Sequence, residues 1–446
     1  MDKVVTRIAP SPTGQMHIGT VRTALFNYLF AKHQSGTYFV RIEDTDKERN
    51  KPEWVEAIWD DFAWCNLEPD IRYVQSEHLP RHRELLHGLI ASGKAYVSKE
   101  EAKDGSGKEV EVVRLKNPGT KITFNDLIRG EVTFDTAEVG DFVIARSIDD
   151  PLYHFAVVAD DHEAGVTHVI RAEEHISNTP RQILILEALG FPRPIYAHIP
   201  LILAPDRSKL SKRKHAASVE NYREQGYLPE AMINYLALLG WNPGTEEELF
   251  TLDELVTRFS LEQVQKSGAI FDEIKLKWFN REYIMRLSED SFLESAKGFL
   301  SEKTLSALTK KGMLGKLFPV MRERIQTFGE LRELDVAGEF DFYANTPTYA
   351  NEKLLPKGES GMAKTAERLR RSAELLRPLH EDDWNAEKIK EVLWPYAEQE
   401  GRGAVLWPVR FALSGKEKSP DPFTIAGILG KDETEKRIER AIGLLS

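Results

Sequence analysis

Cysteine is almost absent from this chain of 446 residues, which contains only Cys65. A single cysteine can form neither a disulfide framework nor a cysteine zinc cluster, so we expect no structural zinc. This composition is typical of the reducing cytosol, and we expect a cytoplasmic protein. Long hydrophobic runs are also missing: none approaches the ~18 residues of a membrane-spanning helix, and the first residues lack the apolar core of a signal peptide. We therefore expect no role in a membrane.

Excess positive charge is missing as well. The chain carries 60 Lys and Arg against 71 Asp and Glu, which gives a net charge of −11. Taken as an average, this charge argues against a nucleic-acid partner. The whole excess lies in residues 1–290, however, because residues 291–446 hold 25 basic and 25 acidic side chains. The second part of the chain can therefore still present a basic face.

The remaining composition is that of a globular protein, with 41% hydrophobic and 29% charged residues, which is too apolar for a disordered chain. The length predicts two to four domains. Over the first 95 residues, apolar runs typical of buried strands alternate with segments of helical spacing. This alternation predicts an α/β domain with a doubly wound parallel sheet. The expected strands are 4–9 and 37–43, and the expected helices cover 21–35, 53–64 and 81–91.

The pattern changes after this first part of the chain. Short alternating runs within 96–146 predict a β-rich insertion. The alternation of strands and helices resumes with the apolar runs YHFAVVA (153–159) and VTHVIR (166–171), followed by a helix over 179–189. Thr179 is the expected N-cap of that helix, with Pro180 in its first position and Gln182 completing a capping box. Beyond about residue 218 nearly all patterns are helical, and we expect a domain boundary near residue 290.

A turn rich in proline and glycine, APSPTGQMHIGT (9–20), follows the first expected strand. In an open parallel sheet, ligands bind beyond the carboxyl ends of the strands, where the amino terminus of the next helix favours phosphate. His17 lies just before that helix and could donate to a phosphate oxygen. The alternative is a purely structural turn, because the stretch is neither a dinucleotide fingerprint nor a P-loop.

A second stretch, RSKLSKRK (207–214), packs five cationic side chains into eight residues. Taken alone, such a run is more often solvated surface than a binding loop. Within the acidic first part of the chain, so dense a cationic loop favours a polyanionic ligand. Lysines on a loop would suit a triphosphate whose charge is redistributed during a reaction.

Together, HIGT (17–20) and KLSKR (209–213) resemble the paired HIGH and KMSKS signatures of class I aminoacyl-tRNA synthetases. The flanking segments narrow the resemblance to glutamyl-tRNA synthetases of the bacterial type: TRIAPSPTG, RTALFNYLFA, RIEDTD, VIRAEEHISNTPRQ, PEAMINYLALLGW and KSGAIFD. They span roughly residues 6–272. The resemblance implies an α/β fold with a Rossmann-type doubly wound parallel sheet and a β-rich insertion, followed by a mostly α-helical C-terminal half. It also implies a glutamate-tRNA ligase.

The resemblance further implies a division into domains with separate roles. Residues 1–95 and 148–217 are the expected halves of a Rossmann catalytic domain, and the second half carries the KLSKR loop. Residues 96–147 are expected to form an insertion that binds the acceptor end of tRNA. Residues 218–290 are the expected helical stem-contact domain, and residues 291–446 are the expected all-helical anticodon-binding domain. For the insertion, a simple β-hairpin remains the alternative.

Site residues follow from the same resemblance. Glutamate brings two carboxylates and one ammonium, so its pocket needs cations and at least one anion. The residues that match the family's glutamate contacts are Arg7, Ser11, Glu43, Tyr153 and Arg171. Those expected to bind ATP are His17, Gly19, Thr20, Glu174, His175 and Lys212. His17, Lys209 and Lys212 are the expected catalytic residues.

The implied reaction needs ATP with Mg²⁺, L-glutamate and tRNA(Glu), and we expect a monomer. Whether tRNA(Gln) is also charged is left open by the sequence. Thr20, Leu210 and Arg213 depart from the HIGH and KMSKS signatures, while both lysines and Ser211 are kept. Two alternatives remain: a catalytically silent tRNA-binding paralogue, and the shorter relative that transfers glutamate to queuosine in tRNA.

Overall fold

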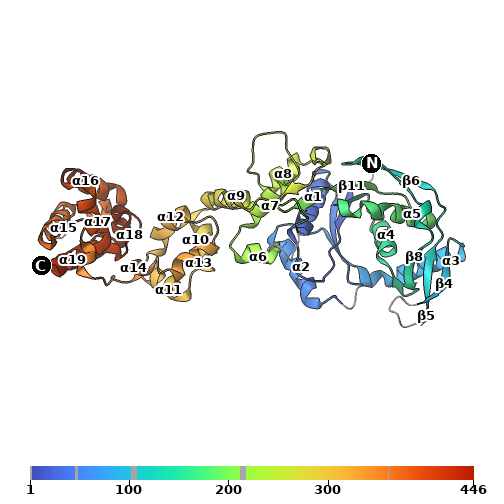
Figure 1. Ribbon diagram of the computed structural model, residues 1–446, viewed down its shortest axis with the longest axis horizontal. Helices are drawn as coiled ribbons and strands as arrows, with labels where there is room; N and C mark the ends of the chain where they lie inside the picture. The colour runs from blue at the N-terminus through green and yellow to red at the C-terminus, as the bar shows by residue number, and fades with distance from the viewer. Residues whose placement is uncertain (1–2, 46–48, 102–107, 211–216, 360) are drawn as a thin grey trace. The chain divides into compact units, whose positions relative to one another are not determined.

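The computed structural model describes residues 3–45, 49–101, 108–210, 217–359 and 361–446. The chain divides into two compact units, Met1–Phe279 and Asn280–Ser446. Figure 1 shows strands gathered in the first unit, whereas the described residues of the second unit form helices and no strand.

A parallel sheet forms the centre of the first unit. Strands β1, β2 and β3 pair in parallel in that order, and β10 pairs in parallel with β11. The N–H of Thr167, just before β10, donates to the carbonyl oxygen of Val5 at 3.1 Å, so β10 lies beside β1. This arrangement confirms the predicted doubly wound α/β fold. The strands are β1 (Val5–Ile8), β2 (Thr37–Ile42), β3 (Ile71–Val74), β10 (His168–Ala172) and β11 (Ile195–Ile199).

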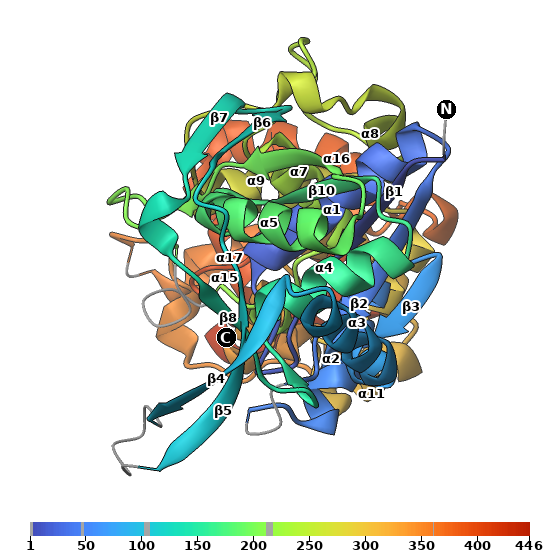
Figure 2. The ribbon, with the colours of Figure 1, turned by 90° about the vertical axis from the view of Figure 1, so that its right-hand side faces the viewer.

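Helices cover the sheet. Helix α1 is buried along most of its length, and the side-chain amide of Asn27 donates to the carbonyl of Ile170 in β10 at 3.0 Å, which fixes the helix against the sheet. Figure 2 shows α4 and α5 in front of β1 and β10. The helices of this part are α1 (Ile18–His33), α2 (Pro52–Trp64), α3 (Leu79–Ala91), α4 (Tyr153–Glu163) and α5 (Thr179–Leu189).

Two expectations about this region were wrong. The run 153–159, placed in the alternation as a strand, begins helix α4, whose residues from Phe155 to Asp161 are all buried. A short apolar run has no polar face, so its periodicity does not separate a buried helix from a buried strand. Thr179 is not the N-cap of α5 but its first residue, after Asn178, and no side-chain capping bond forms. Its hydroxyl lies within hydrogen-bond distance of Arg171 and His198 instead.

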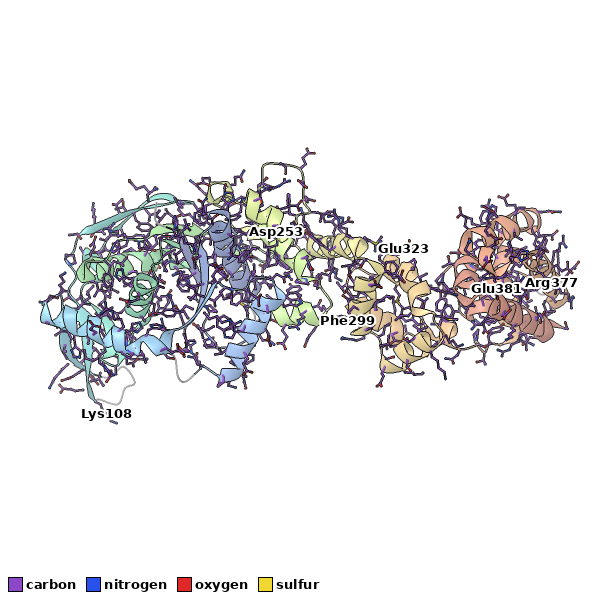
Figure 3. All side chains as sticks on the ribbon, turned by 180° about the vertical axis from the view of Figure 1, so that it is seen from behind. Lys108, Asp253, Phe299, Glu323, Arg377 and Glu381 are labelled. Atoms are coloured by element: carbon purple, nitrogen blue, oxygen red, sulfur yellow. The ribbon has the colours of Figure 1, made fainter. Side chains whose placement is uncertain are left out.

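The β-rich insertion contributes to two sheets. Its strands β4, β5 and β8 form an antiparallel sheet with β9, which follows the insertion, in the order β4-β5-β8-β9. Strands β4 and β5 extend away from the parallel sheet (Figure 2). Lys108, labelled in Figure 3, precedes β5. The hairpin β6-β7 instead joins the parallel sheet, because β6 pairs with β11 through Asp126 and Tyr196. The strands are β4 (Ala95–Glu101), β5 (Glu109–Leu115), β6 (Lys121–Asp126), β7 (Gly130–Asp135), β8 (Phe142–Ser147) and β9 (Asp150–Pro151).

The remainder of the first unit is mostly helical, as predicted. Helix α8 starts with a capping box, in which the Thr251 hydroxyl accepts from the N–H of Glu254 and the Glu254 carboxylate accepts from the N–H of Thr251. Two short strands, β12 (Ile202–Leu203) and β13 (Ala269–Ile270), pair in parallel. The helices are α6 (Val219–Glu224), α7 (Pro229–Leu238), α8 (Leu252–Arg258) and α9 (Glu273–Arg286), the last of which runs into the second unit.

The second unit consists of helices. On α15, Arg368 is buried and pairs with Glu359 at 2.6 Å. Arg377, labelled in Figure 3, is the C-cap of this helix. Among the described residues, no helix is long and apolar enough to cross a membrane. The helices are α10 (Glu289–Lys297), α11 (Glu302–Lys310), α12 (Leu314–Arg324), α13 (Gly329–Val336), α14 (Asp341–Ala344), α15 (Met362–Leu376), α16 (Ala386–Glu400), α17 (Arg402–Ser414), α18 (Pro422–Leu429) and α19 (Lys431–Leu445).

Candidate active site

A cavity of about 570 Å³ lies where β1 and β10 end. In a doubly wound sheet this edge is where ligands bind. Every predicted site residue that the structure describes lines this cavity: Arg7, Ser11, His17, Gly19, Thr20, Glu43, Tyr153, Arg171, Glu174, His175 and Lys209. Lys212, the remaining predicted residue, lies outside the described residues.

The two signature segments meet at this cavity. The N–H of Ile18 donates to the carbonyl of Ala217 at 3.0 Å, and the N–H of Val219 donates to the carbonyl of Met16 at 3.0 Å. Lys209, the first lysine of the cationic stretch, lines the same cavity as His17. Backbone hydrogen bonds therefore attach the chain that follows the cationic stretch directly to the histidine-bearing turn.

His17 is the N-cap of α1. Its Nδ1 accepts from the N–H of Gly19 at 3.0 Å, which leaves the ring proton of a neutral imidazole on Nε2. The N–H of Thr20 donates to the carbonyl of His17 at 2.8 Å. His17 thus accepts the backbone N–H groups of both Gly19 and Thr20, two of the residues expected to bind ATP. A β-carbon on Gly19 would lie 3.1 Å from Nδ1, so the absence of a side chain lets the imidazole cap the helix.

Lys209 and Glu174 form an ion pair across the cavity. The side chains are 58% and 42% exposed, so water screens their attraction and the pair contributes little stability. A ligand with several phosphate charges can therefore replace Glu174 as the partner of Lys209 at small cost.

Arg171 is a buried cation at the end of β10, where its side chain lines the cavity. Its Nε donates to Nε2 of His198 at 3.1 Å and its Nη2 donates to the hydroxyl of Thr179 at 2.8 Å, and both partners are neutral. Burial lowers the pKa of Arg171. Nη1 is buried and has no hydrogen-bond partner among the described residues. A buried donor left without a partner is costly, and a carboxylate ligand would satisfy it.

A buried ionic network supports the other side of the pocket. Nε of Arg7 donates to Oδ1 of Asp161 at 3.1 Å, and Nη1 of Arg41 donates to the same oxygen at 2.5 Å. Nη2 of Arg41 donates to Oε1 of Glu43 at 3.1 Å. Burial acts to raise the pKa of Asp161, but Arg7 and Arg41 outweigh it and hold this pKa below its ordinary value.

Sequence reasoning missed the residues that hold this pocket in place. Asp160 accepts from Gln75 and from His82, each at 2.6 Å, and its neighbour Asp161 holds Arg7. Arg22 also lines the cavity, donates to the carbonyl of Leu239 at 3.0 Å, and has its pKa lowered by burial to about 10. One sequence signal was available for the acidic pair: two adjacent aspartates end the apolar run of α4, where charged side chains need buried partners.

His175 is expected to make the fold sensitive to acid. Burial, followed by the positive charge of Arg171, lowers the pKa of His175 to about 4, whereas an unfolded chain gives about 6.5. As the pH falls, the unfolded state therefore binds the proton before the folded state does. The contribution of neutral His175 to the free energy of unfolding is fully present above pH 6.5 and is lost as the pH falls toward 4. Between pH 6.5 and pH 4, the unfolding temperature of a His175→Gln variant should fall less than that of the parent protein. Parallel curves of unfolding temperature against pH for parent and variant would contradict this.

Family models match most of the chain. The model described as tRNA synthetases class I (E and Q), catalytic domain, matches residues 3–104 and 97–278, and an anticodon binding domain matches residues 291–442. The chain is thus a class I tRNA synthetase of the E and Q group. The shared cavity of its two signature segments is the place expected for the chemistry of this group.

Relatives of this synthetase match along its whole length. A glutamate-tRNA ligase of Carboxydothermus hydrogenoformans is 42% identical, with 98% of this chain and 99% of the relative covered. One of Caldanaerobacter subterraneus is 39% identical, with 99% of this chain and 98% of the relative covered. The chain belongs to the class I glutamyl-tRNA synthetases. It is therefore an enzyme that attaches glutamate to tRNA. Among solved structures, a glutamate tRNA ligase from Elizabethkingia meningosepticum, in complex with its amino acid, matches with a TM-score of 0.85 at 32% identity, with both chains fully covered.

Proposed function

We propose that this synthetase joins L-glutamate to the 3′ end of tRNA(Glu) in two steps, through a glutamyl-adenylate formed from ATP. The observation that carries the proposal is the cavity between the two signature segments, whose lining combines buried cations with the partly buried carboxylate of Glu43. The charges of this lining are complementary to those of glutamate beside a triphosphate.

Arg171 and Arg7 bind the carboxylates of glutamate in this proposal, and Glu43 faces its ammonium. The buried Nη1 of Arg171 supports the first assignment, because the described residues offer it no acceptor. For Glu43, burial raises the pKa while Arg41 opposes the rise. An ammonium group beside it would favour the charged form further. Ser11 and Tyr153 complete the pocket.

ATP binds on the other side of the cavity. Nε2 of His17 is the donor for a phosphate oxygen, because Nδ1 is occupied by the N–H of Gly19. Thr20 lies beside it, Glu174 and His175 contact the nucleoside, and His175 does so as a neutral ring, because its pKa is lowered to about 4. Lys209 exchanges Glu174 for the phosphates, and Lys212 is assigned to the leaving pyrophosphate by its place in the signature.

The chemistry needs no protein nucleophile. The carboxylate of glutamate attacks the α-phosphate, pyrophosphate leaves, and a hydroxyl of the terminal tRNA nucleotide then takes the glutamyl group from AMP. The contribution of the protein is positioning and the stabilisation of charge. Mg²⁺ would enter with ATP and neutralise phosphate charge. Such ions are held mainly by substrate phosphates.

The other parts of the chain serve tRNA. We assign the insertion 96–147 to the acceptor end, residues 218–290 to the stem and residues 291–446 to the anticodon, and we assign no structural zinc because the one cysteine, Cys65, is buried outside the insertion. The match of residues 291–442 to an anticodon binding domain favours this function over the shorter relative that modifies queuosine. We further assign a monomer in the cytoplasm.

Charging of purified tRNA(Glu) and tRNA(Gln), measured side by side with labelled glutamate, tests this function. We expect glutamate on tRNA(Glu) only when ATP is present. Glutamate on tRNA(Gln) as well would extend the specificity to both tRNAs. Binding of tRNA(Glu) without any charging would instead favour a catalytically silent paralogue.

A further inference from the structure

A buried carboxylate-imidazole pair lies behind Arg171. Oδ2 of Asp126 lies 2.6 Å from Nδ1 of His198, and both side chains are completely buried. Asp126 comes from β6 in the insertion, whereas His198 comes from β11 of the parallel sheet. The proposed reaction uses neither residue directly.

This pair determines which ring nitrogen of His198 carries the proton. Burial acts to raise the pKa of Asp126, but the hydrogen bonds from His198 and from backbone N–H groups lower it overall, so the carboxylate is charged and can only accept. Nδ1 of His198 must therefore donate. Burial also lowers the pKa of His198, which favours the neutral ring with a lone pair on Nε2. That lone pair accepts the N–H of Arg171 Nε at 3.1 Å.

The same contacts orient the guanidinium of Arg171. Nε is held by His198 and Nη2 by the hydroxyl of Thr179 at 2.8 Å, so two of its three nitrogens are fixed from behind. Thr179 and His198 lie within 3.2 Å of each other, which makes the support one connected cluster. Nη1 is the nitrogen that has no partner among the described residues.

We propose that Asp126 and His198 are positioning residues for glutamate, which hold the guanidinium of Arg171 in the orientation that accepts a substrate carboxylate. Asp126 fixes the proton on Nδ1 of His198, and His198 then presents a lone pair to Arg171. This inference rests on the proposed role of Arg171 in glutamate binding. It also gives the insertion, assigned to the acceptor end of tRNA, an indirect part in amino-acid recognition.

The contacts from Asp126 through His198 to Arg171 form a relay. An Asp126→Asn substitution tests this relay with almost no change in the shape of the side chain. Oδ1 of Asp126 accepts the N–H groups of Ile128, Arg129 and His198 at 3.0, 2.8 and 3.2 Å, so the amide oxygen of asparagine stays there and its NH₂ faces Nδ1 of His198. His198 must then carry its proton on Nε2, where it opposes the N–H of Arg171. We expect the KM for glutamate to rise about ten- to hundredfold, with the KM for ATP unchanged.

A matched control exists in the same insertion. Asp141 accepts the N–H of Asn117 at 2.8 Å and the hydroxyl of Tyr96 at 3.0 Å, and it makes no contact with Arg171. An Asp141→Asn variant makes the same atomic exchange and should keep the parent KM for glutamate. The double variant Asp126→Asn with Arg171→Ala should be no weaker for glutamate than Arg171→Ala alone, because both changes act through one side chain.

The outcomes separate this relay from the glutamate pocket itself. If Arg171→Ala raises the KM for glutamate while Asp126→Asn leaves it at the parent value, the relay is wrong and the pocket stands. If Asp126→Asn raises the KM values for glutamate and ATP together and lowers the unfolding temperature, the pair is only structural. If Arg171→Ala itself leaves the KM for glutamate unchanged, the proposed pocket fails and the relay fails with it.

Discussion

Replacing Arg171 with alanine is expected to lower kcat/KM for glutamate by about 30- to 5,000-fold, which corresponds to the loss of about 2–5 kcal/mol for one partner of a buried, hydrogen-bonded charge pair. Arg171 is 5% exposed, and its hydrogen-bond partners among the described residues, His198 and Thr179, carry no carboxylate, so a substrate carboxylate would be its direct ion-pair partner. Aminoacylation measured over a range of glutamate concentrations gives this value. The KM for ATP should change little.

Two further variants test whether the charge and the shape of Arg171 are both needed. Arg171→Lys keeps the positive charge but loses the planar fork, so it should recover only part of the loss. Arg193→Ala removes an arginine from the surface of the same unit, where it pairs with Glu187, and should keep the parent kinetics because exposed pairs contribute little. Parent-like use of glutamate by Arg171→Ala would remove Arg171 from the pocket.

Replacing Asp161 with alanine is expected to cause the largest loss of stability in the first unit. Asp161 lies between Arg7 and Arg41, whose side chains are 5% and 0% exposed. Removing the carboxylate leaves the two buried cations without their shared counter-charge, which costs about 3–5 kcal/mol. For a unit of this size the unfolding temperature should fall by roughly 6–20 °C. Thermal scans at one fixed rate measure this difference, because large enzymes often unfold irreversibly.

The control for this variant is Asp149→Ala. Asp149 pairs with Arg83 on the surface, with side chains that are 68% and 53% exposed, so its removal should shift the unfolding temperature by no more than about 2 °C. If Asp161→Ala melts as this control does, Asp161 does not compensate the two arginines.

Sequence patterns predicted the main elements well where one face of an element is polar or where turn residues mark its ends. Strands β1 and β2 and helices α1, α2 and α3 appear within a few residues of their expected bounds. The same reasoning failed for 153–159, because every residue from Phe155 to Asp161 in α4 is buried and no polar face shows the helical period. It also missed β3, a strand of four residues with an exposed start.

The insertion shows a different limit of sequence reasoning. Its alternating runs predict strands correctly, but alternation does not say which strand pairs with which. β6 joins the parallel sheet beside β11, while β4, β5, β8 and β9 form a sheet of their own. Partner choice depends on packing between segments that are far apart in sequence, here Asp126 and Tyr196.

The sequence by itself determined the family, the fold class and many of the residues that line the cavity, because the signature segments contain side chains whose charge and donors the chemistry requires. Only the tertiary structure decided how those side chains are held. Asp161 is shared by Arg7 and Arg41, and His198 passes the effect of Asp126 to Arg171. These partners are distant along the chain, and folding removes them from water, so their charges and proton positions depend on neighbours that no local pattern records.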